Sequence, residues 1–146
     1  MDEPIDEILD TRVLHALEAS QDASMQLIRY GRDTGMEIAS ETITLRPQHL
    51  TDLRELFLNP KTYWIGLKRC APLNIVRITL SPTNLVAILD FRCNSVTFTV
   101  GSVRSHAFFD HRRDDLMLLV NHYFPSETSL DCATLVKKEF LTLPRK

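Results

Sequence analysis

Two imidazoles and several carboxylates crowd into residues 105–115 of this chain. Histidine together with carboxylate can bind zinc or a redox metal, or can transfer protons in acid–base catalysis. His106, Asp110 and His111 are therefore the candidate metal ligands, and they would make the chain a metal-dependent enzyme. Their spacing matches no established ligand motif, because His106 and Asp110 share a face only if the segment is helical.

A structural role explains the same stretch without any metal. Asp110 can cap a helix that begins near residue 112, and Asp114 and Asp115 then fall in the first turn, where the helix dipole favours negative charge. Phe108 and Phe109 would pack inward. Motif-free clusters of this kind are usually structural, so we expect no catalytic residue and no cofactor here.

A second stretch alternates aromatic and basic residues: Tyr63 and Trp64 lie between Lys61 on one side and Lys68 and Arg69 on the other. Such a pattern can stack bases and hold phosphates. The alternative is that the two aromatic side chains anchor the preceding helix to a sheet. The net charge of −2 and the pI of about 6.2 count against a dedicated nucleic-acid binder. An exposed Trp64 would instead indicate a protein-binding surface.

Three cysteines, Cys70, Cys93 and Cys132, occur without a CxxC pair. An odd number without paired spacing does not indicate a disulfide framework, and in a reducing compartment we expect small buried thiols. Cys70 and Cys93 both fall at edges of predicted strands and could lie close together. The sequence leaves open whether they are joined.

Hydrophobic periodicity predicts three helices, with apolar residues recurring every three or four positions. Alternating or continuous apolar runs predict strands, and the last three are joined by loops short enough for an antiparallel meander. Turn residues at 31–35 separate the first two strands as a hairpin, 63–68 could add a strand, and 130–141 fits either helix or strand. The predicted helices are 4–19, 47–58 and 112–124, and the predicted strands are 25–30, 38–45, 74–81, 85–92 and 96–100.

These elements predict an α+β fold in which an antiparallel β-meander sheet carries about three helices in two layers. The chain has 146 residues, 44% hydrophobic and 25% charged, without repeats or a flexible linker, so we expect one globular domain over residues 1–146. No apolar run approaches the ~20 residues of a membrane span. The mixed, acidic start at residues 1–7 differs from a signal peptide, which predicts a cytoplasmic protein.

Short motifs spread over about half the chain resemble a group of small bacterial α+β proteins that share a central RCAP segment and a terminal FP. The resemblance implies a bacterial origin and a single domain, and the group has no assigned activity to transfer. Some members hold a cysteine pair where this chain has Cys93 alone, which argues against a metal or redox role. The matching segments are 69–72, 76–78, 87–93, 109–110, 118–120 and 123–125.

The sequence contains none of the GxSxG, P-loop, GxGxxG or HExxH motifs that would suggest a particular enzyme. We therefore expect a small non-enzymatic module that binds another protein, comparable to an immunity protein or an inhibitor. A mildly acidic surface would speed its association with a basic partner. An exposed edge strand of the meander could also pair two copies of the chain.

Overall fold

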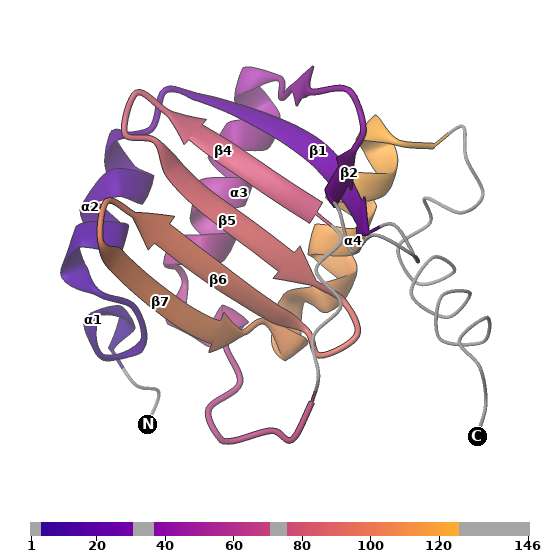
Figure 1. Cartoon of the computed structure of the whole chain (residues 1–146). Coiled ribbons are helices and arrows are strands. Elements are labelled where there is room, and N and C mark those ends of the chain that lie inside the picture. The colour runs from indigo at the N-terminus through magenta and orange to yellow at the C-terminus, as the bar shows by residue number, and fades with distance from the viewer. Residues whose placement is uncertain (1–3, 31–36, 71–75, 126–146) are drawn as a thin grey trace, which may run out of the picture.

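A computed structural model of the chain describes residues 4–30, 37–70 and 76–125, and a seven-stranded antiparallel sheet dominates them (Figure 1). The strands run in the order β2-β1-β4-β5-β6-β7, and β3 pairs with β1 beyond the end of β2. The strand bounds are β1 Asp22–Tyr30, β2 Glu37–Ala39, β3 Ile43–Thr44, β4 Val76–Ser81, β5 Leu85–Asp90, β6 Ser95–Val100 and β7 Val103–Phe108.

The helices gather on one face of this sheet, behind it in the view of Figure 1, so that the described residues form two layers. Strand β4 shows the reason, because its buried and half-buried residues alternate and only one face is apolar. Leu17, Phe57 and Leu116 pack from the helical layer into one hydrophobic core with the inner face of the sheet. The helical elements are α1 Ile5–Ile8, α2 Thr11–Ala19, α3 Pro47–Leu58, η1 Pro60–Thr62, η2 Asp110–Arg112 and α4 Arg113–Tyr123.

This architecture confirms the predicted two-layer α+β fold, and several elements agree closely with the sequence pattern. Helix α3 has the predicted bounds, from Pro47 at its first position to Leu58. The strands β4, β5 and β6 form the predicted antiparallel meander. The predicted strand 38–45 is wrong as a single element, because it is divided into β2 and β3, which both run antiparallel to β1. The predicted turn at 31–35 and the segment 130–141 lie outside the described residues.

The predicted first helix is wrong as a single element, because it breaks at Leu9 and Asp10. The carboxylate of Asp10 accepts a hydrogen bond of 2.8 Å from the backbone N–H of Arg12, which caps α2 and starts a new helix. The same hydrogen bond, followed by that of the Arg12 side chain, lowers the pKa of Asp10. Strand β1 also begins earlier than the predicted strand 25–30, at Asp22.

Strand β7 is the main element that the sequence did not predict. Val103 and Ala107 point into the core while Arg104 and His106 are exposed, so the segment alternates as an edge strand does. The strand predicted at 63–68 is reduced to a single bridge between Trp64 and Phe108 of β7. Among the described residues the longest helix is α3 with 12 residues, and no helix is long and apolar enough to cross a membrane.

Candidate functional site

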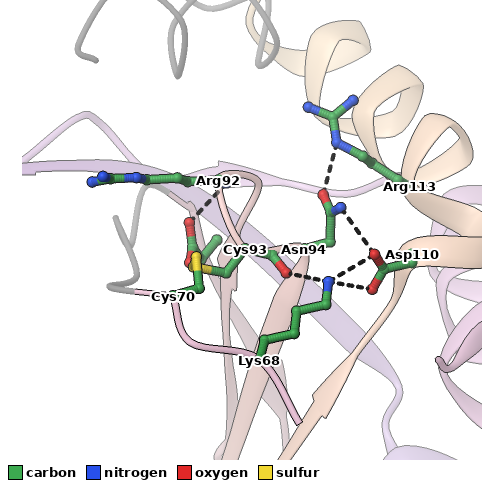
Figure 2. Close-up of a disulfide and its surroundings, with 8 residues drawn as sticks. Lys68, Cys70, Arg92, Cys93, Asn94, Asp110 and Arg113 are labelled. Carbon is green, nitrogen blue, oxygen red and sulfur yellow. Dashed lines mark hydrogen bonds and ion pairs between the residues drawn. A yellow bond between two sulfur atoms is a disulfide. The ribbon is translucent and has the colours of Figure 1, made fainter. Parts of the chain in front are cut away.

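The two stretches singled out by residue type, 63–69 and 105–115, meet in space at one end of the sheet. Lys68 comes from the loop that follows η1, and Asp110 comes from η2, directly after β7. The ammonium of Lys68 lies 2.7 Å from one carboxylate oxygen of Asp110 and 2.8 Å from the other (Figure 2). The two candidate sites are therefore one cluster, held together by an ion pair.

Lys68 makes as many hydrogen bonds as its ammonium has protons. Besides the two bonds to Asp110, it donates a bond of 2.9 Å to the backbone carbonyl of Cys93 in the turn between β5 and β6. Its charge also lies 4.8 Å from the ring centre of Phe108 and 5.2 Å from that of Trp64, within reach of a cation–π attraction. Lys68 thus ties the loop to the end of the sheet and has no hydrogen-bonding capacity left for a ligand.

Trp64 fastens the start of the same loop. Its backbone N–H donates a bond of 2.8 Å to the carbonyl of Phe108, and the two rings meet edge to face with centres 5.9 Å apart. Gly66 lies against this ring: a Cβ built on it would come within 2.5 Å of the Trp64 side chain, and its φ of +153° is one that other residues rarely adopt. Glycine is therefore required at position 66.

Cys70 and Cys93 form a disulfide, which corrects the expectation of unpaired, buried cysteines at these two positions (Figure 2). Cys93 is buried, but Cys70 is exposed. The bond closes the far end of the loop onto the same turn whose carbonyl accepts from Lys68. Cys132 lies outside the described residues.

The turn that carries Cys93 is itself connected to α4. Asn94, which adopts a left-handed backbone with φ 57°, donates from its side-chain amide to Asp110 at 3.3 Å and accepts from the Arg113 guanidinium at 2.7 Å. Asp110 is thus engaged by two side chains, and the prediction that it caps the last helix is wrong: the residue before α4 is Arg112, which makes no capping bond. Asp114 and Asp115 do fall in the first turn as predicted.

We call the residues that fix this loop the clasp: Trp64, Lys68, Cys70, Cys93, Asn94, Phe108 and Asp110. Between its attachment points the clasp leaves out three residues, Ile65-Gly66-Leu67, which we call the tip. Ile65 is 53% exposed and Leu67 is 97% exposed, although both are large aliphatic side chains. The clasp therefore fixes a loop that carries two apolar side chains in solvent.

Sequence reasoning missed the tip residues. The signal that could have found them is the segment from Trp64 to Lys68, in which two aliphatic residues flank a glycine and no alternating strand pattern is present. The reading that the aromatic residues anchor helix and sheet is closer to the structure: Tyr63 is 3% exposed and its hydroxyl donates a bond of 2.6 Å to the carbonyl of Phe57 in α3. Burial raises the pKa of this tyrosine far above its ordinary value.

This placement weakens the nucleic-acid reading of the same stretch. Tyr63 is buried and cannot stack on a base, and the charge of Lys68 is neutralised by Asp110. Lys61 and Arg69 are exposed, but the half-buried Trp64 between them has its ring packed against Phe108. Of the four residues predicted to form a binding surface, Arg69 is exposed, Trp64 and Lys68 are half-buried, and Tyr63 is buried.

The three predicted metal ligands serve different parts of the structure. His106 lies on β7, and its Nδ1 is 2.9 Å from the hydroxyl of Thr97 on β6, while Asp110 binds Lys68 and His111 is exposed on η2. Desolvation, followed by the positive charge of Arg104, lowers the pKa of His106, and Asp90 opposes the shift. In the part of the chain that the structure describes, no three His, Cys, Asp or Glu side chains are grouped to hold a metal ion. The metal-enzyme hypothesis gains no support from this geometry.

Comparison with known proteins adds no family assignment, since no family model, no curated protein and no solved structure matches the chain. The resemblance to small bacterial proteins with an RCAP segment therefore stays a prediction.

Proposed function

We propose that this chain is a small non-enzymatic protein that binds another protein through the tip, in the manner of an inhibitor or immunity protein. The observation that carries the proposal is the 97% exposure of Leu67 on a loop fastened by an ion pair, a disulfide and a ring contact. Exposing a leucine so completely brings no stability to the folded chain, because burial of such a side chain stabilises by about 1.5–3 kcal/mol. The same free energy becomes available when a partner covers it.

The clasp would increase the affinity of such a contact. A flexible loop loses conformational entropy when it is ordered by a partner, at about 0.5–1.5 kcal/mol for each immobilised side chain. Here the backbone on both sides of Ile65 and Leu67 is already fixed through Trp64 and Lys68. Rigid loops that present apolar anchors are a common way to reach high affinity over a small area.

Charges beside the tip define the chemistry of the partner. Lys61 and Arg69 are exposed at the two ends of the loop, and Lys68 itself is neutralised. The matching surface is an apolar pocket with carboxylates at its rim, which would pair with the two cations and speed association. A basic partner, expected from the net charge of the whole chain, does not fit this end of the molecule.

The bacterial origin and the cytoplasmic location are further parts of the proposal. The location determines whether Cys70 and Cys93 are oxidised or reduced. Disulfides are rare in the cytosol, where thioredoxin and glutathione keep thiols reduced. In that compartment Cys70 and Cys93 would be a dithiol, and Lys68 and Trp64 would hold the loop without them. In an oxidising compartment all three attachments would act together.

Competitive capture tests the proposed function in extracts of the cells that make the protein. Tagged wild-type protein is incubated with an excess of untagged wild type, of Leu67→Asp, or of Gln48→Asp as a matched control. Gln48 is exposed in the first turn of α3, at the opposite end of that helix from the loop. An added carboxylate is stabilised there by the helix dipole. We expect wild type and Gln48→Asp to displace a captured protein and Leu67→Asp to fail. Equal displacement by all three would contradict the role of the tip, and capture of a second copy of the chain would replace it by a homodimer.

A further inference from the structure

Helices α3 and α4 run antiparallel on the outer side of the helical layer and enclose a groove of about 550 Å³. His49 near the start of α3 contacts His122 near the end of α4, and Asn59 and Arg112 line the opposite end of the groove. A volume of this size is typical of a binding site for a ligand or for a few side chains. The groove uses none of the clasp residues.

Three leucines line the groove among polar and charged residues. Leu56 and Leu119 contribute to the base and are 9% and 8% exposed, whereas Leu118 projects from α4 with 69% of its surface exposed. A one-residue offset on a helix turns the side chain by about 100°, so Leu118 lies beside Leu119 without joining the core. It is one of three large hydrophobic side chains that the described surface exposes, and the other two form the tip.

The side of the groove that α3 forms is acidic. Asp52 and Glu55 lie one turn apart on α3, both are exposed, and neither makes an ion pair with a residue that the structure describes. Asp115 on α4 is already paired with Arg112 at 2.5 Å. Among the described residues, Arg112 is therefore the one Lys or Arg that lines the groove, and it is paired with Asp115 and not with Asp52 or Glu55.

One end of the groove is held rigid by a tyrosine. The hydroxyl of Tyr123 accepts a bond of 2.8 Å from the backbone N–H of Arg46 and makes a short contact with Nδ1 of His49. Since the hydroxyl is already an acceptor, it can donate its own proton to His49. The His49 and His122 rings then pack edge to face with centres 4.5 Å apart, which joins the two helices at this end.

We propose that this groove binds a cationic amphipathic helix of another protein, a contact separate from the tip. Leucine or a similar residue of that helix would cover Leu118 and reach Leu56, and a lysine or arginine one turn away would pair with Asp52 and Glu55. Charge complementarity selects this occupant, because the described lining residues carry a net negative charge and Asp52 and Glu55 lie one helical turn apart on α3. An amphipathic helix that binds in a groove contacts it with residues three or four positions apart, the same spacing that separates Asp52 from Glu55 on α3.

A synthetic peptide tests the groove on the full-length protein. The probe is a fluorescent peptide of about four helical turns with leucines on one face and lysines on the other. We expect saturable binding by fluorescence anisotropy, weakened about tenfold in Asp52→Asn/Glu55→Gln and about tenfold in Leu118→Ser, as expected for loss of about 1.4 kcal/mol each. A peptide with glutamate in place of lysine should not bind.

Two controls separate this proposal from simpler explanations. Glu18→Gln/Asp22→Asn removes the same charge from exposed positions outside the groove, and Leu67→Asp alters only the tip. Both should bind the peptide as wild type does. The groove proposal fails if the first control weakens binding as much as Asp52→Asn/Glu55→Gln, or if the groove variants bind normally. It also fails if the protein sediments as a dimer that Leu118→Asp dissociates, since a second copy then fills the groove.

Discussion

The ammonium of Lys68 and the carboxylate of Asp110 lie 2.7 Å apart at their closest, although 42 positions separate the two residues in the chain. Their side chains are 21% and 29% exposed, so water screens the pair only in part. The contact joins the loop after α3 to the end of β7. It fixes the backbone from which Ile65 and Leu67 project.

The Lys68–Asp110 pair should contribute measurably to stability. Lys68→Met and Asp110→Asn should each lower the free energy of unfolding by about 1–3 kcal/mol, because each change leaves a partly buried charged partner without its bond. A double-mutant cycle in urea should then give a coupling energy above about 1 kcal/mol. The exposed pair Arg12–Asp10 is the control, with an expected coupling smaller than that of Lys68–Asp110. Equal coupling in both cycles would mean that the clasp is no stronger than a surface ion pair.

Gly66→Ala should disturb the clasp, and Trp64 is a built-in reporter because it is the only tryptophan of the chain. The added Cβ would overlap the indole ring, so we expect the emission of Trp64 to shift to longer wavelength as the ring moves into water. Gly101→Ala is the control: its φ of +58° is also positive and costs alanine about 1–2 kcal/mol, but nothing lies within 4 Å of the new atom. An unchanged emission in Gly66→Ala would show that the ring is not held as described.

The disulfide predicts a simple thiol count. In denaturant without reductant one thiol of the three cysteines should react, and after reduction all three should react. Cys70 and Cys93 are 23 positions apart, and their disulfide restricts the conformations of the unfolded chain by closing this loop. Replacing both by serine removes that restriction and should lower the free energy of unfolding by about 3 kcal/mol. In protein purified under oxidising conditions, three reactive thiols before reduction would contradict the pairing.

His106 should make stability depend on pH. Its pKa in the folded state is lower than the ordinary value of 6.5, so the unfolded chain takes up the proton first as the pH falls. Stability should therefore decrease as the pH drops through 6.5 toward the folded-state pKa, and His106→Asn should remove this slope. Arg104→Gln should raise the pKa of His106 in an NMR titration, because the guanidinium charge disfavours protonation. Arg46→Gln, on the helical layer, should leave it unchanged, and an equal rise in both variants would contradict the role of Arg104.

The sequence predicts the helices and strands whose apolar residues recur regularly. It fails where the same residues suggest both a structural element and a chemical site. Helix α3 and the strands β4 to β6 carry regular apolar spacing, and their bounds agree with the pattern. In strand β7, buried and more exposed residues also alternate from Val103 to Phe108. The histidines and aspartates in and after this strand suggested a metal site, and the strand was therefore not predicted. A strand edge tolerates such polar residues because one of its faces is exposed.

The candidate site was less predictable, because its contacts depend on register. Lys68 reaches Asp110 only because β7 ends beside the turn at Cys93, and that position follows from the pairing of Ser95 with Phe108. No local pattern carries this information. Asp52 and Glu55 could have been assigned to one face of the predicted helix, but the facing Leu118 depends on how α4 packs.

Photo-crosslinking at position 67 tests the central claim, that the tip is the surface by which this protein binds its partner. A photoreactive amino acid replaces Leu67 in one variant and Gln48 in another, and both are irradiated in the cells that make the protein. The account predicts one discrete crosslinked product from position 67, with a different protein in it, and none from position 48. Products that are absent from both positions, or identical at both, would contradict the proposed role of the tip.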